Sequence, residues 1–236
     1  MQPDRYTTTP ATAARAAVDA GLRSFLQRVY NRMVLGVLVT AITAFAVSSS
    51  PELMKLFMGG PQAYVIMLAP LAVVWFGFNP MTMSSSKLSI SFFVLSVLYG
   101  LSFSLIFMVY TNTDIARAFF ITTAMFAGLS IFGYTTKKDL TGIGTFCVMG
   151  TIGLVILSVI NMFMQGNTML SNVISAAAIL IFSGVTAWQT QAMKEMYSAT
   201  NSDESNSRLA WSAALTLYIS FIALFQHILH FLGNNR

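Results

Sequence analysis

The chain has 236 residues, of which 56% are apolar and only 9% are charged, and its mean hydropathy is +0.69. A soluble domain carries about 25% charged residues, and a soluble fold of this length could not hide so much apolar surface. The composition therefore predicts a single membrane domain. The net charge of +5 comes from basic residues in loops and tails, so it reflects membrane topology and does not indicate a nucleic-acid partner.

The N-terminal segment is polar and contains arginines, without the apolar stretch of a cleavable signal peptide. We expect disorder over residues 1–10 and a helix over 11–32, with apolar side chains on one face and arginines off it. That helix either lies in the headgroup layer or extends the first span into the cytoplasm. We divide the chain into residues 1–20, a disordered or amphipathic cytoplasmic segment, and residues 21–236, the membrane domain.

Seven apolar stretches are long enough to cross a bilayer, which takes about 20 residues in a helix. Their apolar runs are continuous, which indicates helices and not the alternating strands of a barrel. No charged residue or histidine occurs from Leu140 to Met193, and the polar break at 165–168 divides that stretch into two spans. The expected spans are 33–49, 62–79, 88–110, 116–135, 143–164, 170–192 and 209–232.

The basic residues indicate how these spans are oriented, because cytoplasmic loops of membrane proteins are enriched in lysine and arginine. With the N-terminus in the cytoplasm, ten of the thirteen basic residues fall inside and only Lys55, Arg117 and Arg236 fall outside. Seven spans then place the C-terminus on the periplasmic or extracellular side of a plasma or inner membrane. The polar stretch Ser198–Ser207 is predicted to be a mobile cytoplasmic connection.

Small residues recur at helical spacing in several spans, which favours close helix packing in lipid. These residues predict either a tight monomeric bundle or faces that form a dimer. A proline inside the second span, Pro70, is expected to bend that helix. The small residues are Gly36, Thr40 and Ala44, then Ser96, Gly100 and Ser104, then Ala124 and Gly128, and finally Gly150 and Gly153.

The residues that carry familiar chemistry are missing from the sequence. The only cysteine, Cys147, lies in an apolar run, so an intramolecular disulfide is excluded. His227 and His230 are three residues apart near the end of the last span, without a third metal ligand nearby in the sequence. We therefore expect no enzyme, no cofactor and no metal site.

Uncharged polar residues lie within the apolar spans, where ionisable groups would be the usual sign of function. Gln189 and Ser220 fall in the cytoplasmic halves of the sixth and seventh spans and are able to face one another, and Ser220 shares a helix face with His227. Two interpretations stay open, hydrogen bonds between helices or a hydrated path through the bundle. The full set is Asn161, Gln189, Gln191, Ser220 and Gln226.

One loop resembles a known family. The segment FGYTTKKDLTGIG at 132–144 is similar to the loop after the fourth span in the Bax-inhibitor, or transmembrane Bax-inhibitor-motif, family, in its bacterial branch. The resemblance covers roughly residues 20–236, and it implies a seven-helix bundle with the last helix in the centre. The further similar segments are LIFMVYT at 105–111, GVTAWQTQ at 184–191, ALTLYISFI at 214–222 and FLGNNR at 231–236.

The resemblance also implies a calcium leak gated by pH, through two hydrogen-bonded aspartates in the last two helices. Those positions correspond to Gln189 and Ser220 here, and neither side chain ionises. An arginine common near the end of the second helix in relatives is likewise absent near Asn79 and Pro80. We expect the usual acidic gate to be missing, with His227 as the alternative titrating group.

Two classes of function follow from these observations. The first is a cation leak, calcium being the ion that the resemblance implies, altered or silenced by the missing aspartates. The second is an interaction protein that modulates a membrane-bound quality-control protease or a stress response, as some bacterial relatives do. The N-terminal helix and residues 194–208 would then be the contact elements. The expected partners are the lipid bilayer and either calcium ions or the protease.

Overall fold

The computed structural model describes residues 10–163 and 167–233, and it describes side chains from residue 17 onward. The described residues form helices joined by short connections, with no strand among them. The helices are α1 (Pro10–Ser48), α2 (Pro51–Met58), α3 (Gln62–Phe76), α4 (Ser85–Phe103), α5 (Ile106–Val109), α6 (Asn112–Thr135), α7 (Thr141–Phe163), α8 (Thr168–Met196) and α9 (Asp203–Gly233).

Six helical segments in this part of the chain are long and apolar enough to cross a membrane, with α4 and α5 counted together. The pair α2 and α3 passes the same test only together, and the two helices meet at 74°, so the count is seven when this bent pair is taken as one span. This bend lies at the break formed by Gly59, Gly60 and Pro61, while α3 continues through Pro70. The predicted all-helical membrane bundle is confirmed, and the predicted count of seven spans agrees approximately with six long apolar helices and one bent pair.

Several predicted boundaries change. The segment 11–32 belongs to α1, which is one continuous helix from Pro10 to Ser48, and the disorder expected for residues 1–10 falls almost wholly on residues outside the described ranges. The prediction of a connection up to Ser207 is wrong, because α9 already begins at Asp203. Asp203 and Glu204 lie in its first turn, where carboxylates stabilise the positive end of the helix dipole.

The break between the fifth and sixth predicted spans lies where it was expected, since α7 ends at Phe163 and α8 begins at Thr168. Residues 164–166 lie outside the described ranges, and Asn167 caps the start of α8 by accepting hydrogen bonds from the backbone N–H groups of Met169 and Leu170. This side chain satisfies donors that the first helical turn leaves without partners.

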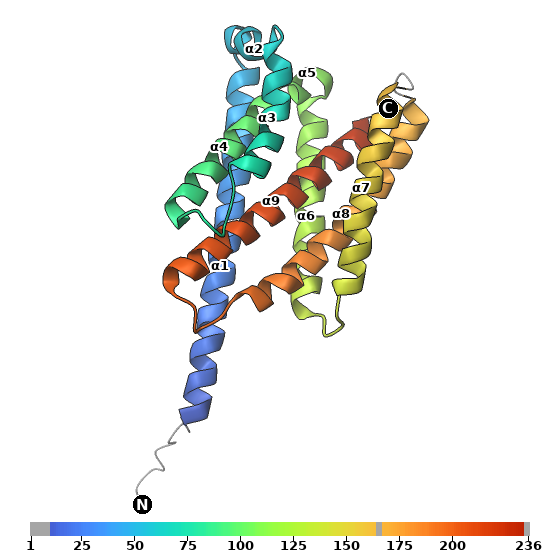
Figure 1. The fold of residues 1–236 in the computed structure, drawn as a ribbon. Coiled ribbons are helices and arrows are strands. Elements are labelled where there is room, and N and C mark those ends of the chain that lie inside the picture. Colours follow the sequence, from blue (N-terminus) through green and yellow to red (C-terminus); the bar gives the residue numbers. More distant parts are fainter. Residues whose placement is uncertain (1–9, 164–166, 234–236) are drawn as a thin grey trace, which may run out of the picture.

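The last helix, α9, crosses the middle of the bundle (Figure 1). It packs against α1, α4, α6 and α8, and 56% of its most apolar window is buried, against 17–33% for the other spans. Its side chains supply much of the hydrophobic core, including the wholly buried Tyr218, Leu217 and Leu224. The prediction of a central last helix is therefore confirmed.

Small residues bring α1 and α4 together. A Cβ atom added at Gly36 would lie 2.6 Å from the Phe92 ring, and one added at Gly100 would lie 2.6 Å from Thr43 Cβ and 2.8 Å from the Thr40 carbonyl oxygen. These two predicted stripes thus pack inside one chain. In contrast, a Cβ atom at Gly128 of α6 or Gly153 of α7 would meet nothing within 4 Å.

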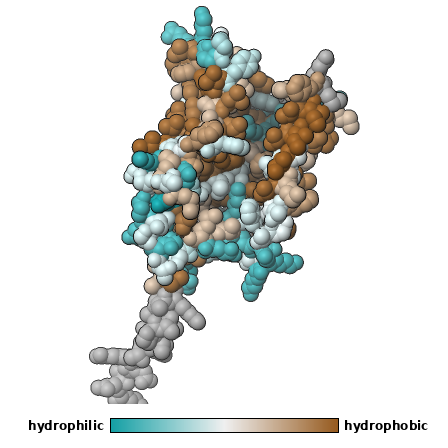
Figure 2. Space-filling model, viewed as in Figure 1, coloured by the Kyte–Doolittle hydropathy of each residue, from teal (hydrophilic) through white to brown (hydrophobic). Residues whose placement is uncertain are grey.

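The outer surface carries large apolar side chains, as a lipid-facing surface requires. Figure 2 shows apolar residues over much of one face, and hydrophilic residues gathered toward the end where the α6–α7 and α8–α9 connections lie. Exposed apolar side chains occur on several spans and include Ile42, Phe120, Phe146 and Leu180.

Candidate functional site

The side chains of Gln189 and Ser220 meet between α8 and α9. Ser220 Oγ donates a hydrogen bond to Gln189 Oε1 at 2.9 Å, and Ser220 is only 1% exposed. The sequence-based expectation that these residues could face one another is therefore met by the geometry. Both side chains are neutral, so this contact between α8 and α9 contains no group that changes charge at physiological pH.

His227 and His230 lie two to three turns further along α9, beside a polar cavity of about 370 Å³. His230 Nδ1 lies 3.0 Å from Ser175 Oγ of α8, and the His227 ring stacks on Phe182 with their centroids 6.2 Å apart. The lining comes from α5, α7, α8 and α9, and consists of Ile106, Tyr110, Ser158, Asn161, Ser171, Ile174, Ser175, Gln226, His227, Leu229 and His230.

Asn161 reaches the same cavity from α7. Its Nδ2 donates to Ser171 Oγ at 2.7 Å, while its Oδ1 is buried and has no hydrogen-bond partner among the described residues. An amide oxygen in this position is able to accept a hydrogen bond from water or to contact a cation. Within the described ranges, no three histidine, cysteine or acidic side chains come together as a metal site would require.

The polar cavity and the Gln189–Ser220 contact are separated by apolar side chains. Phe182 is two turns from Gln189 along α8, and the wholly buried Leu224 is one turn from Ser220 along α9. Neither Gln189 nor Ser220 belongs to the cavity lining. The structure therefore brings Gln189 to Ser220 and His227 to His230, and it places the first pair outside the cavity that the two histidines line.

Gln191 belongs to an apolar span in the sequence, but its side chain contacts polar backbone groups of a loop. Its Oε1 accepts from the backbone N–H of Leu140 at 2.7 Å, and its Nε2 donates to the carbonyl oxygen of Lys138 at 2.8 Å. The side chain thus ties α8 to the α6–α7 connection. The resemblance pointed to this loop, but sequence alone contained no sign of its partner.

Arg208 contacts the connection between α3 and α4. Its Nε donates to the carbonyl oxygen of Pro80 at 2.8 Å, and its guanidinium also contacts the carbonyl of Met81. The Arg208 guanidinium of α9 therefore lies beside the Asn79–Pro80 position. This is the position at which we expected relatives to have an arginine that this chain lacks. Contacts of this kind join residues far apart in the sequence, so sequence patterns do not reveal them.

A second buried polar group escaped sequence analysis. Thr40 Oγ1 lies 2.7 Å from the Tyr218 hydroxyl and 3.0 Å from the carbonyl oxygens of both Gly36 and Ser96. Either hydroxyl group is able to donate in the contact between Thr40 and Tyr218. The position of Thr40 in a small-residue stripe was the available signal, and it was interpreted only as packing.

These features define the class of the protein: a multi-pass integral membrane protein built as a helical bundle around its last helix. The protein-family model described as inhibitor of apoptosis-promoting Bax1 matches residues 22–236. The chain therefore belongs to the Bax-inhibitor family, as the loop at 132–144 predicted.

Proteins of several bacteria resemble the chain along nearly its whole length. An uncharacterized protein of Caulobacter vibrioides is 40% identical, with 96% of this chain and 95% of the relative covered. Uncharacterized protein RP147 of Rickettsia prowazekii is 39% identical, with 98% of both chains covered. Inner membrane protein YbhL of Escherichia coli is 34% identical, with 92% of this chain and 94% of the relative covered.

Proposed function

We propose that this chain is a cation leak protein of the inner membrane whose path follows α8 and α9, and that it lacks a carboxylate-based acid gate. The observation that carries this proposal is the hydrogen bond from Ser220 to Gln189 at 2.9 Å, at the positions of the family's aspartate pair. The polar cavity beside His227 and Asn161 would be the entrance, and Phe182 with Leu224 the barrier. Calcium is the ion that family membership suggests.

The chemistry of the contact explains why flux should be low and insensitive to acid. Two carboxylates held close together share a proton, because the second negative charge strongly raises one pKa. A glutamine and a serine share no such proton, and they offer calcium neutral oxygen atoms where it prefers carboxylates. We therefore expect the hydrogen bond between Gln189 and Ser220 to persist, and the flux past it to stay low, from about pH 6 to about pH 8.

Calcium flux into dye-loaded liposomes tests this proposal at a series of pH values. We expect the native protein to give slow flux with little pH dependence, and the double variant Gln189→Asp, Ser220→Asp to give at least tenfold faster, pH-dependent flux. Each single aspartate variant is the control, because it adds a carboxylate without forming a pair. Equal flux and equal pH dependence in the native protein and the double variant would contradict the proposal.

His227 and His230 are the other groups able to respond to acid near this path. If the native protein shows steep acid-dependent flux that the double variant His227→Ala, His230→Ala loses, the histidines are the gate. Steep pH dependence that survives this double variant would place a gate elsewhere and contradict the assignment of the path to α8 and α9.

The second candidate function, modulation of a membrane-bound quality-control protease, is favoured by the shape of α1. Its N-terminal turns project beyond the rest of the bundle (Figure 1), and Val18 there is 45% exposed. Photocrosslinking from position 18 in native membranes tests this function, with position 146 on the lipid-facing surface as the control. A protease captured from position 18 and not from position 146 would support the second function. If no protease is captured from position 18, the second function is rejected and the cation leak is retained.

The membrane and the orientation are part of the same proposal. The Escherichia coli relative is an inner membrane protein by name, which supports the same location here. The basic residues Lys137 and Lys138 in the α6–α7 connection support a cytoplasmic N-terminus. In a Cys147→Ser background, Lys138→Cys should resist an impermeant thiol reagent in intact cells, because residue 138 would lie in the cytoplasm. Asn112→Cys should react, because residue 112 would lie on the opposite side of the membrane.

A further inference from the structure

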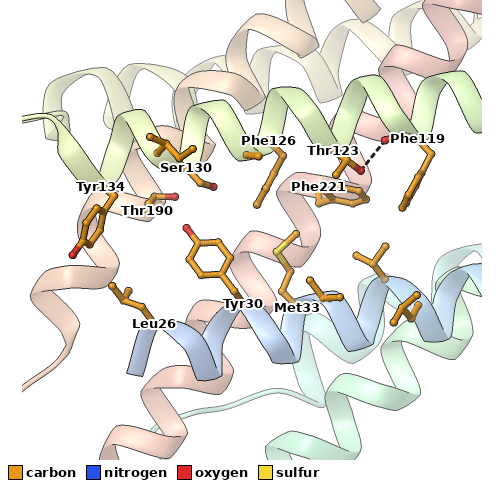
Figure 3. A pocket seen from close by; sticks show the side chains of 15 residues that line it. Leu26, Tyr30, Met33, Phe119, Thr123, Phe126, Ser130, Tyr134, Thr190 and Phe221 are labelled. Carbon is orange, nitrogen blue, oxygen red and sulfur yellow. Dashed lines mark hydrogen bonds between the residues drawn. The ribbon is translucent and has the colours of Figure 1, made fainter. Parts of the chain in front are cut away.

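A groove separates α1 from α6 on the lipid-facing surface. It has a volume of about 510 Å³, and Phe221 of α9 reaches it from the centre of the bundle (Figure 3). A second cavity of about 600 Å³ continues along the same two helices and shares Val37, Leu38, Phe119 and Phe221 with the first. Both volumes fall in the range of ligand cavities, about 300 to 1,000 Å³.

Apolar lining alone would not make this groove a binding site. Its walls include the exposed side chains of Val34 and Leu38, so lipid chains contact it in any membrane. Hydrocarbon gains little by moving from one apolar contact to another, because lipid tails are as apolar as the wall. A preferred occupant therefore needs polar groups that hold it at one depth.

Two residues that line the groove carry buried hydroxyl groups, which a ligand group reaches only when a neighbouring side chain moves aside. Ser130 of α6 is 7% exposed and Thr190 of α8 is 1% exposed, and both hydroxyl oxygens have no hydrogen-bond partner among the described residues. Figure 3 shows their side chains close together in the groove, with the Tyr30 hydroxyl pointing toward them from α1. A buried donor without an acceptor destabilises the fold, so an acceptor on a ligand would be favoured here.

Other hydroxyl groups in the same helices behave differently. Thr122 and Thr123 of α6 donate to the carbonyl oxygens of Ala118 and Phe119, at 2.6 and 2.8 Å. Thr186, one turn before Thr190 on α8, donates to the Phe182 carbonyl oxygen at 2.7 Å. The helix backbone thus satisfies these three hydroxyl groups, and the two in the groove are the exceptions in this comparison.

One end of the groove is next to a cationic residue. Lys194 lies one turn beyond Thr190 on α8, and its ammonium group donates to the carbonyl oxygen of Tyr134 at 2.7 Å and lies 5.3 Å from the Tyr134 ring centroid. Tyr134 lines the groove one turn beyond Ser130. A positive charge is therefore fixed about one helical turn, roughly 6 Å, beyond the two hydroxyl groups.

Further basic residues lie at this end of the molecule. Lys137 and Lys138 are exposed in the connection that follows α6, and Arg23 is exposed one turn before the lining residue Leu26 of α1. The acidic residues nearby in sequence are fewer than the basic ones: Asp19 and Glu195 are exposed, and Asp139 accepts a hydrogen bond from the backbone N–H of Thr141. The charge at this end favours an anion.

We propose that the α1–α6 groove binds an anionic phospholipid of the leaflet next to the α6–α7 connection. One acyl chain lies in the groove, the ester carbonyl accepts hydrogen bonds from Ser130 and Thr190, and the phosphate lies near Lys194. The order of these groups matches a phospholipid, whose esters lie at the boundary of the hydrocarbon core beneath its charged headgroup. Lipid binding here does not require an ion path along α8 and α9, although Thr190 is adjacent in sequence to Gln189.

Native mass spectrometry of delipidated protein tests the proposal by titration with phosphatidylglycerol and phosphatidylcholine of equal chain length. We expect one phosphatidylglycerol to bind at least fivefold more tightly than phosphatidylcholine. The double variant Ser130→Ala, Thr190→Val should weaken this binding about tenfold, since each hydrogen bond in a membrane contributes about 0.6 kcal/mol or more. Lys194→Met should reduce the preference for the anionic lipid.

Matched variants separate this site from general lipid contact. Thr123→Val removes a groove hydroxyl that already has a partner, so binding should not change. Ala127→Trp fills the groove and should abolish binding, whereas Ala124→Trp, one turn earlier and outside the lining, should not. Equal affinity for the two lipids would overturn the proposal. Equal lipid binding by the Ala127→Trp and Ala124→Trp variants, when both are stably folded, would overturn it as well.

Discussion

The first helix, α1, has two flanks with opposite properties. Toward α4, Gly36 and Gly100 let the backbones approach so closely that an added Cβ would lie 2.6 Å from the nearest atom. Toward α6, larger side chains such as Tyr30 and Phe126 line an open groove of about 510 Å³. The comparison shows that small residues close an interface in lipid, where there is no hydrophobic force to press bulky faces together.

The polar groups on the two flanks differ in the same way. On the α4 side, Thr40 and Tyr218 are hydrogen-bonded to each other in the core. On the α6 side, the buried hydroxyl groups of Ser130 and Thr190 have no partner in the described chain. The hydrogen bond on the closed flank therefore stabilises the fold, while the open flank has hydroxyl groups that we propose to bind a lipid.

The largest expected effect is the loss of an aromatic ring from the closed flank. Phe92 is wholly buried and packs on Phe93, Trp211 and Tyr218, so Phe92→Ala should lower the free energy of unfolding by about 3–5 kcal/mol. The measurement is an unfolding titration of the purified protein in micelles.

The matched change on the open flank is Phe126→Ala. This ring is also buried, but it lines the groove, so its loss enlarges a space that lipid or detergent already enters. We expect less than half the cost of Phe92→Ala. Equal losses of stability for the two variants would mean that side chains of the protein, and not lipid or detergent, fill the groove in the micelle.

A smaller effect is expected when the close contact is forced apart. Gly100→Leu should cost about 1–3 kcal/mol, because the new side chain meets Thr43 and the backbone of Thr40. Gly128→Leu is the control, since nothing lies within 4 Å of that position, and its melting temperature should stay near that of the native protein. A large loss from Gly128→Leu would instead indicate an interface with a second chain.

Sequence patterns predicted the features that depend on runs of residues along the chain. Span number, the central position of α9 and the contact of Gln189 with Ser220 follow from apolar length, helical spacing and family resemblance. The stripes at Gly36 and Gly100 were also visible, since close packing requires small residues at every fourth position.

The remaining features depend on which helix faces which. The stripe at Ala124 and Gly128 looked like those of α1 and α4 but faces outward, and the hydroxyl groups of Ser130 and Thr190 look like ordinary helical residues until their partners are examined. The break at Gly59–Pro61 was missed because the prediction weighed only Pro70. A single sequence does not specify helix rotation, so it could not distinguish these cases.

The smallest expected effect compares the two flanks by one isosteric change. Thr40→Val removes a hydrogen bond to the buried Tyr218 hydroxyl, so stability in micelles should fall by about 1 kcal/mol. Thr190→Val removes a buried hydroxyl that has no partner, so stability in micelles should rise, by about 1 kcal/mol.

The same two variants in phosphatidylglycerol nanodiscs make the comparison sharper. If lipid supplies the missing acceptor, Thr190→Val should become destabilising when that lipid is present, while the cost of Thr40→Val should not change with lipid. A cost for Thr190→Val that is the same in micelles and in nanodiscs would show that protein, and not lipid, satisfies this hydroxyl group. Both flanks of α1 would then be closed by the chain itself.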